Sequence, residues 1–446
     1  MRDGLGNLGT RSRNQSVEDK SGIGERDTGM DSNSEGKKGL QYRQVRLPPH
    51  AIKAEQAASS SHHLETLIPV QLTFAMDDLR QWPEPVVPVQ SLSDGGLTSI
   101  PEKYVKPPSD RPSLEANLDP GLTMPVVDLR GIYDGLVDSR AAMVAIWDAC
   151  KEWGFFQLIN HGVRPDLVEE MKGVWREFFR RPLDEKQGYA NSPATYEGYG
   201  SRVGVEKGAV LDWGDYYFLH LHPRSIKSHD RHWPARPSTL RKVTEEYGGE
   251  VFKLCGALLR VLSMGLGLDE EYLRRAFGGD GTASCVRVNL YPKCPQPELT
   301  LGLSPHSDPG GLTVLLADDH VEGLQVRKDG AWLTVRPVPG AFIVNVGDQI
   351  EVICFQSPTT ICMHDVISNG IYKSVAHRVI ANSKDERLSI AFFYNPEGDV
   401  AIGPARELLT PQLPPLYPCI TFNEYRMYVR KRGPSGKSQM KSLKLY

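Results

Sequence analysis

The first half of the chain carries apolar residues at helical spacing. The longest series covers about residues 239–265 and predicts one long amphipathic helix. Its apolar residues follow one another at intervals of 4, 4, 3, 4 and 4 positions: Val243, Tyr247, Val251, Leu254, Leu258 and Leu262. A shorter series predicts a helix that ends at Gly154, and another predicts a helix over about 164–180. Apolar runs at 124–129 and 155–159 predict two short buried strands.

From Ser284 to Pro396 the pattern changes to short β-branched or aromatic runs separated by Gly, Pro, Asn and Asp. Many short strands with such turn residues between them are typical of a sandwich or a barrel. A helix is predicted again from Phe422 to Arg430, so the pattern indicates an α+β protein with a strand-rich core. The predicted strands cover residues 284–291, 312–316, 323–326, 331–335, 341–346, 374–380 and 387–394.

The N-terminal stretch has a different composition from the rest. Residues 1–75 are rich in Gly, Ser, Asn, Lys, Arg and Glu, and such a segment cannot bury enough apolar surface to offset its ordering entropy. We expect a disordered extension that arises from an alternative start, and a regulatory tail is the alternative. The remaining regions are an N-terminal region (76–235), a long helical connection (236–280), a strand-rich core (281–405) and a C-terminal helix and tail (406–446).

Composition and charge exclude several classes of protein. The 446 residues are 40% hydrophobic and 24% charged, with a net charge of −3, so no basic field favours nucleic acid or an acidic membrane. No apolar run approaches the ~20 residues that span a bilayer. Seven cysteines form no C-x-x-C pair, which is typical of free thiols in a reducing compartment. We expect a monomer in the cytoplasm, with some nuclear presence.

Two histidines and an aspartate form the candidate metal site. His306 and Asp308 are two positions apart on an extended segment, so their side chains point to the same side. His377 follows another predicted strand. Two histidines with one carboxylate form the facial triad that binds iron(II) and leaves positions open for oxygen chemistry. An H-x-D pattern alone is weak, and further residues are needed to support this interpretation.

Arg387 and Ser389 supply that support, ten residues or more beyond His377. They also share a face by the two-residue spacing, and a guanidinium with a neighbouring hydroxyl can bind a carboxylate through several hydrogen bonds. This pair predicts a receptor for the far carboxylate of a dicarboxylic keto acid whose keto end chelates the metal. Asn289 and Tyr291 alternate on one strand and can bind the same acid; a solvated polar strand face is the alternative.

These residues together resemble the plant 2-oxoglutarate/Fe(II)-dependent dioxygenase family. The resemblance covers nearly everything from Trp82 to Leu445. Its motifs include W-G-F-F-Q-L-I-N-H-G at 153–162, N-L-Y-P-K-C-P-Q-P at 289–297, L-G-L-S-P-H-S-D-P-G-G-L-T at 301–313, Y-K-S-V-A-H-R-V at 372–379 and R-L-S at 387–389.

The resemblance implies a fold, a cofactor and a reaction. The implied fold is a double-stranded β-helix, a jelly-roll of two sheets flanked by helices. The implied iron ligands are His306, Asp308 and His377, and the implied 2-oxoglutarate ligands are Arg387, Ser389, Asn289 and Tyr291. The implied reaction is oxidative decarboxylation of 2-oxoglutarate to CO2 and succinate, coupled to hydroxylation of a small molecule by O2, with ascorbate as reductant.

Within this family the chain is most similar to jasmonate-induced oxygenases, also called jasmonic acid oxidases. The grounds are L-D-W-G-D-Y-Y-F-L-H at 211–220, F-F-Y-N-P at 392–396 and E-Y-R-M-Y-V-R-K-R-G-P-S-G-K at 424–437. The likeness implies conversion of jasmonic acid to its 12-hydroxy form, hormone inactivation and damping of defence responses. Alternatives are a flavonoid dioxygenase of the anthocyanidin or flavonol synthase type, and an inactive paralogue that acts as a binding protein.

A physical argument favours an acidic substrate. Arg426 and Arg430 are four residues apart on the predicted C-terminal helix and are therefore neighbours on one face. If that helix closes the pocket, they converge with Arg287, which suits a carboxylate better than a neutral flavonoid. Phe218 and Phe393 would contact the hydrocarbon part. The alternative is an ordinary solvated basic helix.

The chain departs from the family pattern in one place. Residues Ile353 to Val366 form fourteen extra positions between the iron-binding motifs. They are either a genuine loop or the product of a retained intron or a displaced exon edge. If they form a surface loop, His377 keeps its place; if they displace the next strand, the iron site is broken. His364 and Asp365 within the insert are expected to be chance residues.

Overall fold

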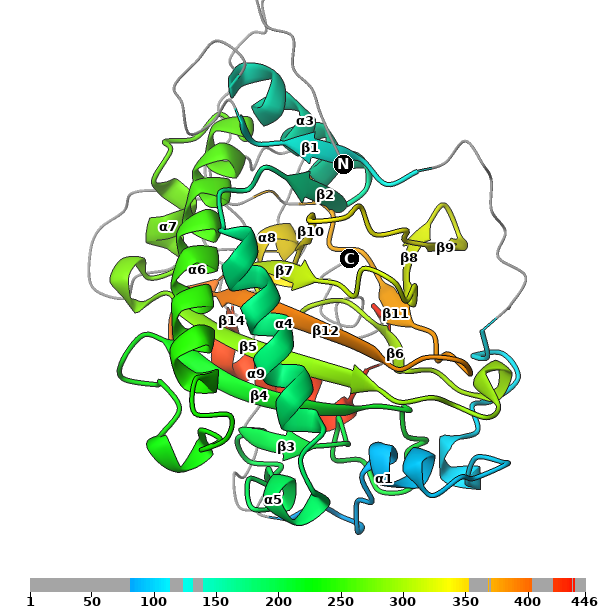
Figure 1. The fold of residues 1–446 in the computed structure, drawn as a ribbon. Coiled ribbons are helices and arrows are strands. Elements are labelled where there is room, and N and C mark those ends of the chain that lie inside the picture. Colours follow the sequence, from blue (N-terminus) through cyan, green and yellow to red (C-terminus); the bar gives the residue numbers. More distant parts are fainter. Residues whose placement is uncertain are drawn as a thin grey trace, which may run out of the picture. The chain divides into compact units, whose positions relative to one another are not determined.

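The computed structural model describes residues 81–112, 123–130, 139–352, 368, 370–402, 420–434 and 436–437. The predicted disordered extension over residues 1–75 and the insert at 353–366, with His364 and Asp365, lie outside these ranges. The described residues form a jelly-roll of two sheets with helices packed against it, which confirms the predicted fold class (Figure 1).

The larger sheet has eight strands in the order β1-β2-β10-β7-β12-β5-β4-β3. All neighbours pair antiparallel except β1 and β2, which are parallel. The strands are β1 (Val126–Asp128), β2 (Phe155–Ile159), β3 (Gly198–Gly200), β4 (Asp215–His222), β5 (Ala283–Tyr291), β7 (Leu312–Leu316), β10 (Phe342–Val346) and β12 (Arg387–Asn395).

The smaller sheet has four strands in the order β6-β11-β8-β9. Apolar side chains from both sheets, such as Ile343 of β10 and Val326 of β8, belong to one buried cluster, so the two sheets share an apolar interface. A further pair of strands, β13 (Ala401–Ile402) and β14 (Ile420–Thr421), leads into the last helix. The strands of the smaller sheet are β6 (Leu303–His306), β8 (Leu324–Lys328), β9 (Ala331–Thr334) and β11 (His377–Val379).

The long predicted helix is α6 (Leu240–Gly265), and all six residues of its apolar stripe are buried. Helices α3 (Ser139–Glu152) and α4 (Pro165–Phe179) contribute to the same core as α6 and the larger sheet. None of the described helices is both long and apolar enough to cross a membrane. The shorter helices are α1 (Val89–Asp94), α5 (Leu183–Gln187), α7 (Tyr272–Ala276), α8 (Asp348–Val352) and α9 (Phe422–Arg432).

Several elements differ from the sequence prediction, which did not include β3, β6 or the short helices α1, α5, α7 and α8. The strand predicted over 374–380 is shorter, because the backbone N–H of Ser374 donates to the Glu351 carboxylate (2.6 Å) rather than to a neighbouring strand. Strand β4 was not predicted, although its alternating burial is typical of a strand with one face in the core. Its first residue, Asp215, is buried and accepts hydrogen bonds from the Tyr199 hydroxyl (3.0 Å) and from two backbone N–H groups that begin α1.

The stripe on α6 makes a stability prediction. Leu254 is 2% exposed, so Leu254→Ala should lower the free energy of unfolding by about 2–5 kcal/mol through lost burial and a residual cavity. Met264 lies on the same helix but is 37% exposed, and Met264→Ala should change the free energy of unfolding by less than about 0.5 kcal/mol. Chemical denaturation followed by circular dichroism measures both, and equal losses would contradict the packing argument.

Candidate active site

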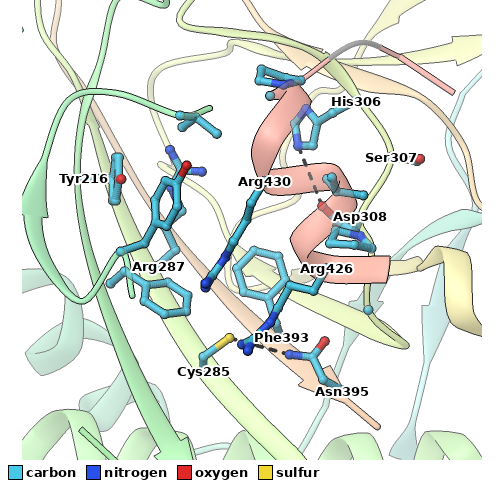
Figure 2. Close-up of a pocket in the computed structure, with 18 of the residues that line it drawn as sticks. Tyr216, Cys285, Arg287, His306, Ser307, Asp308, Phe393, Asn395, Arg426 and Arg430 are labelled. Atoms are coloured by element: carbon cyan, nitrogen blue, oxygen red, sulfur yellow. Dashed lines mark hydrogen bonds and ion pairs between the residues drawn. The ribbon is translucent and has the colours of Figure 1, made fainter. Parts of the chain in front are cut away.

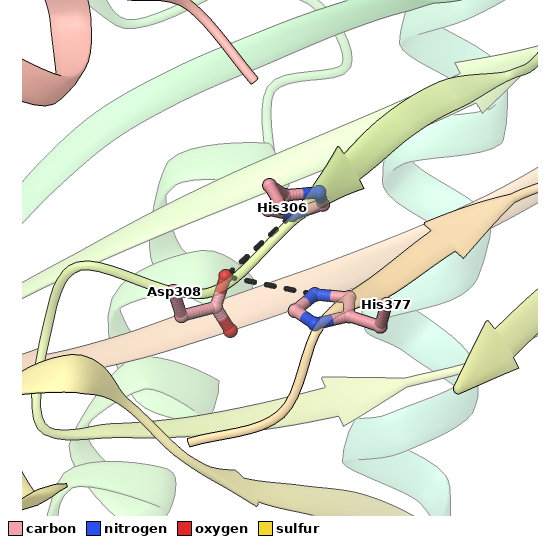
Figure 3. Close-up of side chains that lie close together, drawn as sticks. All are labelled: His306, Asp308 and His377. Atoms are coloured by element: carbon pink, nitrogen blue, oxygen red, sulfur yellow. Dashed lines mark ion pairs between the residues drawn. The ribbon is translucent and has the colours of Figure 1, made fainter. Parts of the chain in front are cut away.

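The three predicted metal ligands lie close together (Figure 3). His306 ends β6, Asp308 follows two residues later, and His377 begins β11 directly opposite His306 in the antiparallel pair. The Nε2 atoms of His306 and His377 each lie 3.7 Å from Oδ1 of Asp308. The three potential ligand atoms lie within 4.8 Å of one another, which is close enough to bind one ion.

Backbone carbonyls orient both imidazole rings. Nδ1 of His306 lies 2.9 Å from the carbonyl oxygen of Ser304, and Nδ1 of His377 lies 3.2 Å from that of Val375. When each Nδ1–H donates to its carbonyl, each Nε2 presents its lone pair toward Asp308. This tautomer is the one that a metal needs, because a ligating imidazole must be neutral and unprotonated at the ligating nitrogen.

The Asp308 carboxylate is held by two residues that sequence reasoning did not identify. Its Oδ2 accepts hydrogen bonds from the Thr313 hydroxyl (2.5 Å) and the Asn345 side-chain amide (2.8 Å). Burial acts to raise the pKa of Asp308, but the two histidines and these two donors outweigh burial and lower it. Asn345 could have been suspected, because it is the polar residue in the apolar run F-I-V-N-V.

The charge state of the cluster also fits a divalent cation. Burial and the neighbouring His377 lower the pKa of His306 to about 4, so this imidazole is neutral at physiological pH. Two imidazole nitrogens and one carboxylate oxygen match the facial triad of non-haem iron(II) sites. Among the described residues, this is the one group of three or more His, Cys, Asp or Glu side chains close enough to hold a metal ion.

The predicted keto-acid residues line an inner cavity beside the triad. Strands β12 and β5 pair so that Arg387 is opposite Tyr291 and Ser389 is opposite Asn289, which brings all four side chains together. The same cavity is lined by the three candidate metal ligands: His306, Asp308 and His377. A dicarboxylic keto acid could therefore place its far carboxylate on β12 and its keto end at the triad.

Arg387 has the properties of a carboxylate receptor. Its side chain is buried, and its Nε donates to the backbone carbonyl of Val321 (3.2 Å). Its Nη1 is buried with no hydrogen-bond partner among the described residues. The guanidinium lies over the ring of Tyr291 (5.6 Å), and burial lowers the pKa of Arg387. A buried cation with unused donors is costly unless an anion binds to it.

A larger outer pocket opens beyond the triad (Figure 2). Arg287 of β5 lines both the inner and the outer cavity. Figure 2 shows Arg426 and Arg430 extending from α9 toward the strand that carries Arg287, and all three arginines line this pocket. Phe218 of β4 and Phe393 of β12 line the same pocket. Sequence reasoning missed further lining residues, including Tyr196, Tyr216, Cys285, Leu303 and Asn395.

None of these three arginines has a carboxylate partner in the part of the chain that the structure describes. Arg426 donates to the Asn423 side chain (3.1 Å), and its Nε is buried without a partner there. Burial and the neighbouring Arg430 lower the pKa of Arg426 to about 10, and burial lowers the pKa of Arg430. Arg287 lies 4.1 Å over the ring of Tyr216. The pocket therefore carries concentrated positive charge that an anionic ligand would neutralise.

The chain is similar to known oxygenases over most of its length. The family model described as 2OG-Fe(II) oxygenase superfamily matches residues 282–396, and one described as non-haem dioxygenase in morphine synthesis N-terminal matches residues 124–236. Jasmonate-induced oxygenase 2 of Arabidopsis thaliana is 52% identical over 377 residues, which cover 84% of this chain and 97% of that protein. Flavanone 3-dioxygenase 2 of Oryza sativa subsp. japonica is 40% identical and covers 75% of this chain and 92% of that protein.

A solved structure agrees with these likenesses. The crystal structure of JOX2 in complex with 2OG, Fe and JA is 52% identical in sequence to this chain and has a TM-score of 0.74. The match covers 82% of this chain and all of that one (100%). The fold described above therefore also occurs in a protein whose crystal structure is a complex with 2OG, Fe and JA.

Replacing one candidate ligand should remove the metal. His377→Ala leaves two of three ligand atoms, so we expect the affinity for iron(II) to fall by at least about 10-fold, the low end for losing a metal-site contact. Isothermal titration with iron(II) under anaerobic conditions measures this loss. His320 is exposed and lies outside the cluster, so His320→Ala is the matched control and should bind iron(II) as the wild type does. Equal affinities of the two variants would contradict the assignment.

Proposed function

The chain belongs to the 2OG-Fe(II) oxygenase superfamily, and we propose that it hydroxylates a small carboxylated plant metabolite, most specifically jasmonic acid at carbon 12. The chain is a 2-oxoglutarate/Fe(II)-dependent dioxygenase; the identity of its substrate is the proposal. The observation that carries it is the convergence of Arg287, Arg426 and Arg430 on the outer pocket without carboxylate partners among the described residues.

Three guanidinium groups without a direct carboxylate partner among the described residues favour an acid over a neutral substrate. A carboxylate bound between them would restore charge balance and receive bidentate hydrogen bonds from planar N–H donors. A neutral flavonoid would leave the same charges buried and uncompensated, which is unfavourable. The similarity to Jasmonate-induced oxygenases 1 to 4, at 50–52% identity, supports the same choice against the flavonoid alternative.

The aromatic side chains of the pocket would bind the rest of the substrate. Phe218 and Phe393 line the outer pocket, and Phe393 also lines the inner cavity beside the triad. Apolar contact with these rings would hold a short hydrocarbon chain between the guanidinium groups and the metal site. Fixing both ends of a small molecule limits which carbon can approach the reacting centre. This arrangement supports attack at a carbon distant from the carboxylate.

We propose that the chain's own residues divide the reaction between two cavities. His306, Asp308 and His377 would hold iron(II), and Arg387, Ser389, Asn289 and Tyr291 would hold 2-oxoglutarate in the inner cavity. The bound iron supplies the oxidative decarboxylation of 2-oxoglutarate and the hydroxylation of the substrate, with ascorbate as reductant. The surrounding side chains orient both acids and exclude water from the inner cavity. The complete set of these residues gives no support to the inactive-paralogue alternative.

Arg387 should control binding of the co-substrate. Arg387→Ala removes the cation that faces the far carboxylate, so we expect the KM for 2-oxoglutarate to rise by about 30- to 1000-fold, corresponding to about 2–4 kcal/mol. Arg387→Lys keeps the charge but loses the planar fork of N–H donors, so its KM for 2-oxoglutarate should lie between those of the wild type and Arg387→Ala. Succinate release at varied 2-oxoglutarate, with jasmonic acid saturating, measures this series. A wild-type KM in Arg387→Ala would contradict the assignment.

Arg426 and Arg430 should control binding of the acidic substrate. Arg426→Ala or Arg430→Ala should raise the KM for jasmonic acid by about 30- to 150-fold, the effect of losing about 2–3 kcal/mol of charge-assisted hydrogen bonding. The KM for 2-oxoglutarate should stay within about twofold of wild type, because the two acids bind different arginines. Mass spectrometry of hydroxyjasmonate and succinate measures both constants.

Arg432 provides the matched control for this test. It lies on the same helix, is exposed and stacks on Tyr428 outside the pocket lining, so Arg432→Ala removes the same charge without touching the pocket. The KM of the Arg432→Ala variant for jasmonic acid should equal that of the wild type. Succinate formation by wild-type protein with no hydroxyjasmonate would reject jasmonic acid and direct the search to flavonoids. Equal effects of Arg432→Ala and Arg426→Ala would reject a specific carboxylate site.

A further inference from the structure

The side chain of Asp348 is hydrogen-bonded to three segments that carry residues of the active site. It begins α8, directly after β10 and Gly347, and is 2% exposed. Its carboxylate accepts hydrogen bonds from three hydroxyl groups: Ser307 (3.0 Å), Ser374 (2.7 Å) and Tyr425 (2.6 Å). These three donors come from three different parts of the chain, and each lies within three residues of a residue of the site.

Two of the hydroxyl groups hold the iron-bearing segments. Ser307 lies between His306 and Asp308, so its side chain points away from theirs on the extended segment. The backbone N–H of Asp348 also donates to the carbonyl of Asp308 (2.7 Å). Ser374 precedes His377 by three residues on the segment that enters β11. Asp348 therefore holds both iron-bearing segments on the side opposite the metal.

The third hydroxyl group belongs to the helix that carries the pocket arginines. Tyr425 is buried and immediately precedes Arg426 on α9. The N-terminus of α9 is closed by an exposed capping box between Thr421 and Glu424, which orders the helix itself but does not attach it to the sheets. The bond from Tyr425 to Asp348 is therefore a direct polar link between α9 and the iron-bearing segments.

The C-terminal end of the same region is attached to α8 as well. Lys437 forms an ion pair with Glu351 of α8 (2.5 Å), and the N–H of Gly436 donates to the carbonyl of Pro305 (2.6 Å), one residue before His306. Residues on both sides of the pocket arginines are thus tied to α8 or to β6. Burying the Asp348 carboxylate costs free energy of desolvation even though three hydroxyl groups donate to it, and apolar residues would fill the same space at a lower cost. Stability alone therefore does not account for a carboxylate at this position.

We infer that Asp348 is a positioning residue that keeps the acid-binding helix α9 aligned with the two segments that hold iron. This inference rests on the proposed function only in calling α9 acid-binding; the mechanical link is independent of the substrate. It predicts that the effect on α9 can be separated from the effect on the iron-bearing segments. Removing the Tyr425 hydroxyl breaks only the bond from α9 to Asp348, whereas replacing Asp348 affects the bonds to α9 and to both iron-bearing segments.

Hydrogen exchange and iron binding test the link without any substrate. In Tyr425→Phe, amides of 422–432 should exchange about fivefold faster or more, while amides of 303–308 and 374–379 and the iron(II) affinity stay at wild-type values. In Asp348→Asn, all three segments should exchange faster, and the iron(II) affinity, read from the absorption of the anaerobic iron–2-oxoglutarate complex, should fall about 10-fold. Tyr199→Phe removes a matched hydroxyl bond to the buried carboxylate Asp215, far along the chain, and should change none of these signals.

Steady-state kinetics should show that Tyr425 affects the KM for jasmonic acid but not kcat or the KM for 2-oxoglutarate. Tyr425→Phe should raise the KM for jasmonic acid by about fivefold and leave kcat and the KM for 2-oxoglutarate within about twofold. The inference is overturned if Tyr425→Phe exchanges like Tyr199→Phe over 422–432, or if Asp348→Asn binds iron(II) with wild-type affinity. Absence of jasmonate turnover by wild-type protein would reject the proposed substrate instead, and the exchange and iron titrations would still decide the role of Asp348.

Discussion

The antiparallel pairing of β6 with β11 is the constraint on which the site depends. It places His306 and His377 directly opposite each other, although 71 positions separate them in the chain. The two-residue period of an extended segment then brings Asp308 to the same side. The second oxygen of that carboxylate is bound by Thr313 and Asn345 from the facing larger sheet. The candidate metal site therefore exists where the two sheets meet, and a change in their packing would reach it.

The arginines of both cavities are held in a way that leaves them able to bind anions. Arg387 lies over Tyr291, Arg287 over Tyr216 and Arg430 over Tyr196, at 5.6, 4.1 and 4.9 Å from the ring centres. An aromatic face stabilises a guanidinium from above its plane, whereas a carboxylate binds in the plane through the N–H groups. The rings themselves use none of the N–H donors, although the two terminal nitrogens of Arg430 also donate to the backbone carbonyls of Ala194 (3.4 Å) and Thr195 (3.3 Å). This preorganisation lowers the ordering cost of binding each acid.

Sequence periodicity predicted those features of the structure that depend on spacing within a single helix or strand. The apolar stripe of α6, the shared face of Asn289 and Tyr291, and the neighbouring positions of Arg426 and Arg430 all follow from spacing within one element. Contacts between distant elements could not be predicted in this way. The partners of Asp308 and the three donors to Asp348 come from separate strands and helices, and only the folded chain brings them together. Strand β4 was missed because only its second half, Leu219 to His222, alternates apolar and polar residues, whereas its first half carries aromatic residues on both faces.

The fourteen positions by which the chain departs from the family pattern raise a different question, namely how the candidate metal site tolerates them between His306 and His377. The residues on either side of the undescribed segment are bonded to each other. The hydroxyl of Ser368 donates to the carbonyl of Ile350 (2.7 Å), and the N–H of Gly370 donates to that of Glu351 (3.1 Å). The chain thus leaves α8 and returns to it at adjacent points, before Ser374 and His377 enter their places. For a segment whose two ends are bonded together, each doubling of its length costs only about 0.6 kcal/mol of loop-closure entropy. Helix α8 is therefore bonded both to the residues that lead into β11 and, through Asp348, to α9.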